Sequence, residues 1–412
     1  MSEFFDKLET RSAAQREAEQ FALLQQQLAH AKEQTPAFAE LFAEVDPGAV
    51  QDRTALARLP LLRKSELIKK QEQQPVFGGL CAIAAPELAQ IFVSPGPIFE
   101  PGSARPDFWR FARALYAAGV RSGDILQNCF SYHFTPAGMM FESGARALGC
   151  VTIPAGAGQT EQQVQVMARI KPMGYVGTPS FLKIILDQAA ATGIELKSLN
   201  KALVSGEYLP PKLRETWAER GIATLQCYAT ADLGLIAYES PAREGLIVDE
   251  GIILEIVRPG TADPLPAGEV GEVVVTSLTP DYPLIRFATG DLSAILPGPS
   301  PCGRTNQRIK GWLGRADQTA KVRGLFVHPS QVADVIKRHP EVAKGRLVLS
   351  RENDSDRMLL QCECATAAPD LTAALQETVR AVCRLRAEIE LVPSGNLPND
   401  GKVIEDTRPV AS

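Results

Sequence analysis

The residues from Tyr282 to Gly324 carry the most specific chemistry of this 412-residue sequence. An apolar run ends in Thr289-Gly290-Asp291, and a second turn, Gly314-Arg315-Ala316-Asp317, follows it. A carboxylate that a glycine turn holds at the end of a buried strand can accept hydrogen bonds from both hydroxyls of a ribose. Its charge roughly doubles the strength of each bond. The pattern therefore predicts that Asp291 binds the ribose of a nucleotide.

Each of these motifs alone is also typical of an ordinary turn, because Gly and Asp are the commonest turn residues. A third motif, Gly401-Lys402, lies near the C-terminus in the segment LPNDGKVIEDTR. The three motifs in this order resemble those of the adenylate-forming superfamily, which contains acyl-CoA synthetases, luciferases and the adenylation domains of peptide synthetases. Within that superfamily the chain is similar to the phenylacetate-CoA ligase branch.

The resemblance extends along nearly the whole chain. Further similar segments occur in the expected order at residues 56–67, 131–163, 205–222, 227–239 and 314–342. This order is more specific than any single motif. It implies an AMP-forming ligase that activates a small carboxylic acid with ATP and Mg²⁺ as an acyl-adenylate, and then transfers the acyl group to coenzyme A.

Length and periodicity indicate the architecture independently. A chain of 412 residues is longer than one typical core and suits two domains. Between about residues 80 and 313, short apolar segments such as QIFVS alternate with helical ones such as DFWRFARALYAAG, which is typical of a parallel sheet covered by helices. We expect an α/β fold: a large N-terminal domain (residues 1–316) with parallel sheets and a β-rich subdomain, and a small α+β C-terminal domain (residues 317–412) on a hinge.

The resemblance implies roles for the nucleotide-binding residues. Lys402 is expected to be catalytic, because a cation must neutralise charge when a carboxylate attacks the α-phosphorus. Arg315 is expected to contact ribose or phosphate, and Tyr228 to stack on adenine. The simpler readings are a solvated lysine near the end of the chain and a core tyrosine. The remaining residues expected around the nucleotide are Ser205, Gly206, Glu207, Ala229 and Thr230.

A second group of residues is expected to handle the acid. His133 matches a segment that borders the acyl pocket in relatives, and we assign it a catalytic role there, although a His with aromatic neighbours is often a hydrogen-bonded core residue. The expected walls of the acyl pocket are Tyr132, Phe134, Ala155 and Gly156, whose shapes favour an aromatic or similarly compact acid.

Relatives use one active site for both half-reactions by rotating the small domain about a hinge. The resemblance places this hinge at Asp317 or Gln318, where a few residues can absorb the whole motion. After rotation, Arg323 and Gly324 are expected to shape the tunnel for coenzyme A while Lys402 leaves the site.

The phosphate loop departs from the family pattern. Typical members have a run such as SSGTTGKP, whose amides and hydroxyls wrap the phosphates. Residues 94–101 read SPGPIFEP here, so three prolines remove amide donors, Glu100 adds negative charge, and Ser94 and Gly96 are the residues left to bind phosphate. Asp232 is the candidate for the acidic residue that helps relatives to hold Mg²⁺.

Zinc is not expected. Relatives in this branch often hold a structural zinc through cysteine and histidine, and this chain has Ser240, Ile247 and Ser300 near the corresponding places. Only Cys302 survives, and a tetrahedral site needs about four ligands.

Composition limits the partners and the compartment. A net charge of −5 provides no extended basic surface, so a nucleic acid partner is not expected. The longest uncharged run, residues 125–141, contains too many polar groups for a membrane span. Eight cysteines without regular spacing and an N-terminus without a secretory signal predict a cytoplasmic protein, with Cys362 and Cys364 packed in a core. A homodimer is one assembly that the sequence leaves open.

Two alternatives to the CoA ligase remain. A non-catalytic relative could keep the fold and a pocket for AMP, an acyl group or coenzyme A, which the proline-rich phosphate loop would favour. An adenylating enzyme could instead pass the acyl group to a carrier protein. The presence of Asp291, Arg315 and Lys402 favours an active enzyme.

Overall fold

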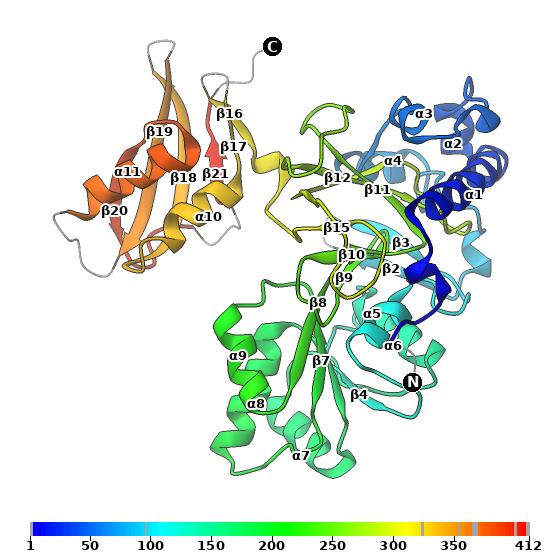
Figure 1. Cartoon of the computed structure of the whole chain (residues 1–412), viewed down its shortest axis with the longest axis horizontal. Helices are drawn as coiled ribbons and strands as arrows, with labels where there is room; N and C mark the ends of the chain where they lie inside the picture. The colour runs from blue at the N-terminus through cyan, green and yellow to red at the C-terminus, as the bar shows by residue number, and fades with distance from the viewer. Residues whose placement is uncertain are drawn as a thin grey trace. The chain divides into compact units, whose positions relative to one another are not determined.

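The computed structural model describes residues 3–94, 97–322, 325–352, 355–364, 370–398 and 402–408. The chain divides into two compact units, one formed by residues 1–289 and 294–311 and the other by residues 290–293 and 312–412. Figure 1 follows the chain through both units. The predicted functional boundary between residues 316 and 317 stays a prediction. Gly96, Arg323 and Gly324 lie outside the described residues.

The first unit opens with helices. Ser12 caps the longest helix, since its hydroxyl accepts a hydrogen bond from the Gln15 amide, and this helix buries an apolar stripe that includes Leu24 and Leu28. Leu23, on the same helix, is 49% exposed. The helical elements are η1 (Lys7–Thr10), α1 (Ala13–Gln34), α2 (Pro36–Leu41), η2 (Pro47–Ala49), α3 (Arg53–Ala57), η3 (Lys64–Glu66), α4 (Leu67–Gln73) and η4 (Ala85–Glu87).

A nine-stranded sheet forms the centre of the first unit (Figure 1). Its parallel part has the order β5-β4-β6-β7-β8, and its antiparallel part continues from β8 through β9, β10 and β15 to β14. The strands are β4 (Ile125–Asn128), β5 (Val151–Pro154), β6 (Gly174–Gly177), β7 (Lys201–Val204), β8 (Ala223–Thr230), β9 (Gly234–Glu239), β10 (Leu246–Val248), β14 (Ile295–Leu296) and β15 (Arg308–Ile309).

Helices cover this sheet and enclose two apolar clusters. One cluster includes side chains of α7 (Thr160–Ile170), α8 (Pro179–Ala191) and α9 (Pro211–Glu219). The other includes side chains of α5 (Phe111–Ala117) and α6 (Ala137–Ala147). The parallel sheet covered by helices that the alternating pattern predicted is therefore confirmed.

The segment QIFVS does not join this parallel sheet. It forms β2 (Gln90–Ser94), which pairs with β3 (Ile98–Gly102) in an antiparallel hairpin. The prediction that QIFVS begins the parallel alternation was wrong, because the next strand along the chain follows at once and gives β2 a local partner. In the stretch that the family pattern assigns to phosphate binding, β2 therefore ends at Ser94, and its antiparallel partner β3 begins at Ile98.

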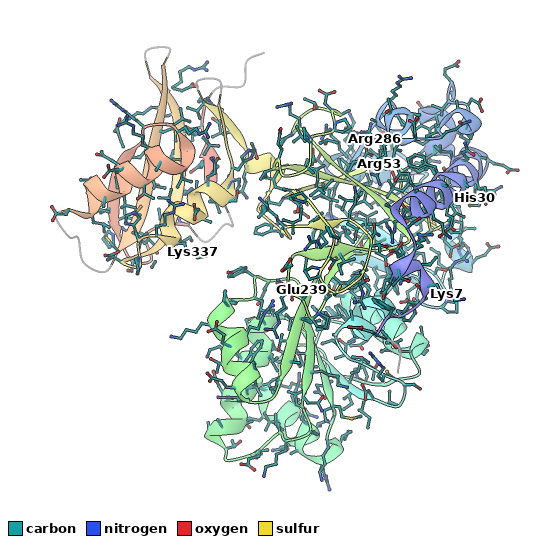
Figure 2. The ribbon with its side chains drawn as sticks, viewed as in Figure 1. Lys7, His30, Arg53, Glu239, Arg286 and Lys337 are labelled. Atoms are coloured by element: carbon teal, nitrogen blue, oxygen red, sulfur yellow. The ribbon has the colours of Figure 1, made fainter. Side chains whose placement is uncertain are left out.

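The β-rich part is a four-stranded sheet in the order β1-β13-β12-β11, formed by β1 (Leu62–Arg63), β11 (Ile252–Val257), β12 (Gly271–Ser277) and β13 (Phe287–Ser293). Arg286, fully buried just before β13, holds this part together. Its guanidinium donates two hydrogen bonds to Glu255 on β11, at 3.0 Å each, and others to the carbonyls of Ala57, Leu59 and Ala262. Five donors therefore meet five acceptors, and each buried polar group is satisfied. Arg53 also reaches β11, through the carbonyl of Leu254 (Figure 2).

The second unit is a smaller α+β structure. Its main sheet has the order β20-β19-β18-β21, and its core includes Cys362 and Cys364, which confirms their predicted packing role. Its elements are η5 (Ala316–Gln318), β16 (Ala320–Val322), β17 (Leu325–Val327), α10 (Pro329–Lys337), β18 (Val342–Glu352), β19 (Ser355–Cys364), α11 (Leu371–Cys383), β20 (Glu388–Pro393) and β21 (Ile404–Asp406). Across the described residues, no helix combines the length and apolarity that a membrane span requires.

Replacing Arg286 by Met should lower the free energy of unfolding by about 3–5 kcal/mol, because Glu255 then stays buried without its partner. The shift of the urea-unfolding midpoint measures this loss. Lys183→Met is the matched control, since Lys183 pairs with Asp187 on the surface of the same unit, and we expect a change within about 0.5 kcal/mol there. Equal effects of the two substitutions would contradict the role given to Arg286.

Candidate active site

The carboxyl ends of the parallel strands create the first part of the site. A small cavity of about 200 Å³ opens there, at the end of β8 and beside α6. Its apolar lining includes Phe130, Met140 and Phe141, and the Phe130 and Phe141 rings stack with their centroids 4.5 Å apart. The residues that line it are Ser94, Phe111, Phe130, Thr135, Pro136, Ala137, Met140, Phe141, Ser205, Gly206, Ala229, Thr230 and Ala231. None of these side chains is ionisable at neutral pH.

Four predicted nucleotide residues lie in the wall of this cavity: Ser205, Gly206, Ala229 and Thr230. The Ser205 hydroxyl donates to the carbonyl of Cys227 at 2.8 Å, which ties the end of β7 to β8. Glu207 is exposed and accepts hydrogen bonds from the amide and hydroxyl of Ser180 at the start of α8. The structure therefore brings the two predicted segments, 205–207 and 228–230, to one edge of the sheet.

Tyr228 is buried on β8, with 8% of its surface exposed. Its hydroxyl lies 3.5 Å from the Thr289 hydroxyl, which in turn donates to the carbonyl of Val273. The Tyr228 segment is thus attached to β13 two residues before Asp291. Glu239 steadies β8 from the next strand, because it accepts hydrogen bonds from both the amide and the side chain of Gln226 and also binds Arg214 of α9 (Figure 2).

Asp291 and Arg315 form an ion pair within the second unit, with Arg315 Nη1 3.2 Å from Asp291 Oδ1. Trp312 Nε1 donates to the same oxygen at 3.1 Å. Gly290 adopts a φ of +76°, and a Cβ there would lie 2.6 Å from Arg315 Nη2, so a larger residue would displace the guanidinium. The Thr-Gly-Asp and Gly-Arg-Ala-Asp motifs, 24 residues apart, thus meet in space.

Lys402 is exposed and lies two residues before β21. The side chain of Gln318, one of the two predicted hinge residues, accepts a hydrogen bond from the amide of Val403 at 2.8 Å. The predicted hinge and the segment of the predicted catalytic lysine are therefore connected within the second unit. Asp317 lies in η5 beside Gln318.

The predicted acyl residues do not surround the cavity. Tyr132 and Phe134 are absent from its lining, as are Ala155 and Gly156. The Tyr132 hydroxyl donates to Glu142 at 2.9 Å and accepts from Asn128 at 2.7 Å, and burial together with the Glu142 charge raises the pKa of Tyr132 well above its usual range. Phe134 is 66% exposed and packs edge-on against the exposed ring of His133.

The residues that do line the apolar end of the cavity were missed from the sequence. Two signals could have indicated them. Phe130 follows β4, and ligands of parallel sheets bind at the carboxyl ends of the strands. Met140 and Phe141 lie one turn into α6, which directly follows that strand end.

The predicted metal ligand Asp232 is not available at the surface. Its side chain is fully buried, and Lys64 Nζ lies 2.6 Å from its Oδ2 atom. The Ser94 hydroxyl already has a partner, because it donates a hydrogen bond to the side chain of Glu100. The negative charge that the sequence assigned to Glu100 therefore points into the protein and not toward a phosphate.

The region expected to lack zinc contains a hydroxyl and a thiol in contact. The Ser300 hydroxyl lies 3.1 Å from Cys302 Sγ, and Arg304 also donates to this sulfur. The hydrogen bonds from Ser240, Ser300 and Arg304 outweigh partial burial and lower the pKa of Cys302. Within the described parts of the chain, no group of three or more His, Cys, Asp or Glu side chains could hold a metal ion. The absence of zinc itself stays a prediction.

Comparison with known proteins places the chain in a family. Residues 108–279 match the model for AMP-binding enzymes, and residues 324–407 match the model for the C-terminal domain of those enzymes. A phenylacetate-coenzyme A ligase of Thermus thermophilus is 32% identical over 375 residues, which cover 87% of this chain and 83% of the relative. The chain belongs to the AMP-binding, adenylate-forming family, in its phenylacetate-coenzyme A ligase branch. It is an enzyme of the AMP-forming acid–CoA ligase class.

Other members of the branch match along nearly their full length. The phenylacetate-coenzyme A ligase of Escherichia coli K12 is 27% identical over 96% of this chain and 95% of its own. Among solved structures, an open conformation of 2-hydroxyisobutyryl-CoA ligase superposes with a TM-score of 0.85 over 98% of this chain and 95% of that one, at 24% identity. The large-domain and small-domain architecture predicted from the sequence is confirmed.

If the ring of Tyr228 stacks on adenine, Tyr228→Leu should weaken AMP binding by about 5–150-fold, since stacking on an aromatic side chain contributes about 1–3 kcal/mol per base. Tyr228→Phe should bind AMP within about twofold of the wild type, because Phe keeps the aromatic ring on which the base would stack. Isothermal titration calorimetry measures both. Wild-type affinity in the Leu variant would reduce Tyr228 to a core residue.

Proposed function

We propose that this ligase joins an aromatic or similarly compact apolar carboxylic acid to coenzyme A. The observation that carries the proposal is the 200 Å³ cavity, whose lining is mainly apolar, has four hydroxyl side chains (Ser94, Thr135, Ser205 and Thr230) and contains no ionisable side chain. A protein cavity of about 150 Å³ lined by Leu, Ile and Phe holds one benzene molecule, so this cavity suits a single ring or a short branched chain. A long acyl chain or an acid with a second charge would not fit.

The proposed reaction is the one that defines AMP-forming acid–CoA ligases. One oxygen of the acid attacks the α-phosphorus of ATP, the bond to pyrophosphate breaks, and an acyl-adenylate forms. The thiol of coenzyme A then attacks the acyl carbonyl, its proton leaves, and AMP departs with the bonding electrons. We assign Lys402 to the first step, Asp291 and Arg315 to the ribose and phosphate, and Tyr228 to adenine.

Mg²⁺ would reach the site bound to the phosphates of ATP and would neutralise their charge. The geometry does not favour Asp232 as a direct ligand, because its carboxylate is fully buried and paired with Lys64. The geometry also does not favour Ser94 as a phosphate ligand, because its hydroxyl donates a hydrogen bond to Glu100. Gly96 lies outside the described residues and remains assigned to phosphate on sequence grounds.

The small domain is proposed to alternate between two positions. In the first, Lys402 serves adenylation; in the second, Arg323 and Gly324 shape the path of coenzyme A. The bond between Gln318 and the Val403 amide supports a shared movement of hinge and lysine segment. Coenzyme A is favoured over a carrier protein because the phenylacetate-coenzyme A ligases match 82–96% of this chain, whereas the peptide synthetases match 44–51%. Cytoplasmic location, the lack of zinc and a homodimer remain predictions from the sequence.

Acid-dependent exchange of labelled pyrophosphate into ATP tests the proposal. Exchange should occur with acids such as benzoate, phenylacetate or branched short-chain acids and should be absent with long-chain and dicarboxylic acids. Tight binding of AMP or coenzyme A without exchange across this panel would identify a non-catalytic binding protein instead.

Replacing Lys402 by Ala should reduce this exchange by about 10²–10³-fold, the usual cost of removing one group that stabilises charge in a transition state. Thioester formation from a supplied acyl-adenylate should remain largely intact. Lys337→Ala is the control, because Lys337 is an exposed lysine at the end of α10 in the same unit (Figure 2). Equal loss of both half-reactions would remove Lys402 from the assigned role.

The size of the cavity should set the preference for the acid. Met140→Ala widens the apolar end and should raise kcat/KM for larger ring acids, and Ala137→Leu narrows it and should lower kcat/KM for ring acids by roughly tenfold or more, since each methylene contributes about 1–3 kcal/mol of discrimination. Competition between benzoate and a naphthoate measures the shift. Unchanged preferences in both variants would mean that the acid binds elsewhere.

A further inference from the structure

Three buried oxygens behind the cavity have no hydrogen-bond partner among the described residues: Glu100 Oε2, Asp232 Oδ1 and Tyr282 Oη. Their residues are 1%, 7% and 3% exposed. Buried polar groups are nearly always paired, so three orphans in one place require a physical reason. Burial raises the pKa of Tyr282 well above its usual range, and the charges of Asp232 and Glu100 add to this effect, which is consistent with the three groups lying in one buried region.

Glu100 connects this buried cluster to the cavity. It lies on β3, and its Oε1 atom accepts a hydrogen bond from the Ser94 hydroxyl at the end of β2. Ser94 lines the cavity, and so does Ala231, the residue before Asp232. Two residues of the cavity wall are therefore linked to the buried acids: Ser94 by its hydrogen bond to Glu100, and Ala231 as the neighbour of Asp232 in the chain.

The two acids are neutralised in different ways. Asp232 has Lys64 of η3 beside it at 2.6 Å, and the Lys64 side chain is 25% exposed. Among the residues that the structure describes, no cation is in hydrogen-bond contact with Glu100. Ionisation of both acids would place two negative charges against one positive charge in a buried space, which is costly.

Protonation of Glu100 removes this cost. Burial is the main reason that the pKa of Glu100 rises from 4.5 to about 8, and the Asp232 charge adds to it, while Ser94 and Lys64 offset only part of the effect. Within the described part of the chain, Asp232, Lys64 and Tyr282 are the charged and titratable groups that act on Glu100 or are affected by it. At pH 7 the side chain is neutral and carries a proton as a hydrogen-bond donor.

We propose that Glu100 is a positioning residue of the active site: as a neutral acid it fixes Ser94 in the cavity wall and lets hairpin β2–β3 pack onto the Lys64–Asp232 ion pair. The inference rests on the proposed function, because it assigns the cavity to the acid that is activated. It also explains how an acidic residue can occupy a loop that must accept phosphates. Its charge is absent at neutral pH and its side chain points inward.

The pH dependence of kcat/KM for ATP in the exchange assay tests the role of this proton. Above pH 8 the wild type should lose about tenfold per pH unit, because ionised Glu100 repels Asp232 and releases the hairpin. Glu100→Gln, which keeps the shape and the neutral charge, should lack this decline and should lose less than tenfold at pH 7. Glu100→Ala should lose at least tenfold at every pH. Glu87→Gln, an exposed acid in η4 ahead of the same hairpin, should keep the wild-type profile.

The free energy of unfolding, measured as a function of pH, tests the protonation of Glu100 without an activity assay. Between about pH 4.5 and 8 the folded state holds the Glu100 proton and the unfolded state has released it, so the contribution of this group to the free energy of unfolding decreases as the pH rises through that range. The wild type should lose stability relative to Glu100→Gln over this window. Its infrared spectrum at pH 7 should also contain a protonated carboxyl band that the Gln variant lacks.

Three results would overturn the proposal. The first is an alkaline decline that persists in Glu100→Gln, and the second is a folded Gln variant as inactive as Glu100→Ala at pH 7, since both assign the effect to another group or to a charged Glu100. The third is the absence of the carboxyl band from the wild type. If the wild type shows no exchange at all, the proposed function fails, while the infrared and stability measurements still decide the state of Glu100.

Discussion

The cost of burying a carboxylate governs how this ligase holds its active site. An ionised acid in the protein interior needs a cation, a set of donors or a proton. Three buried acids of the first unit each use a different solution. Glu255 receives two bonds from the buried Arg286, Asp232 receives the ammonium of Lys64, and Glu100 keeps its own proton. Each of these neutralised acids fixes one of the segments that carry the functional residues.

Each of these buried acids supports a strand or turn that carries residues of the candidate site. Arg286 anchors the start of β13, and this strand then carries Thr289 to the Tyr228 hydroxyl and Asp291 to its ion pair with Arg315. Asp232 and Glu100 support the turn after β8 and the hairpin β2–β3, which contribute Ala231 and Ser94 to the cavity. The apolar end of that cavity belongs to α6 and to the end of β4, where packing and not charge determines the shape. In the proposed assignment, binding of the nucleotide and selection of the acid therefore depend on different kinds of interaction.

The order of motifs was sufficient to predict the fold and the family, and the structure adds that Asp291 and Arg315 contact each other. Motifs of this kind depend on local backbone geometry. At Gly290, for example, only glycine fits easily, because φ is positive and a Cβ would lie against the Arg315 guanidinium. The cavity lining could not be predicted in the same way. Phe111, Phe130 and Phe141 come together only through tertiary packing, and their spacing in the sequence resembles that of any core.

Glu100 shows the limit most clearly. In the sequence it is an acid among prolines in a loop, and exposure with a repulsive charge is the ordinary expectation for such a residue. The pairing of β2 with β3 turns it inward, and only the structure shows that Ser94, Asp232 and Lys64 surround it. The departure from the family pattern at this loop is therefore compatible with an enzyme, because the substituted acid is removed from the surface that phosphates would meet.

Oxygen-18 transfer tests the acyl-adenylate mechanism most directly. A compact acid labelled in both carboxylate oxygens is incubated with the enzyme, ATP, Mg²⁺ and coenzyme A, and the products are analysed by mass spectrometry. The mechanism requires one labelled oxygen in the phosphate of each AMP, one in the thioester carbonyl and none in pyrophosphate. Label in inorganic phosphate or pyrophosphate, or thioester formed with unlabelled AMP, would contradict it.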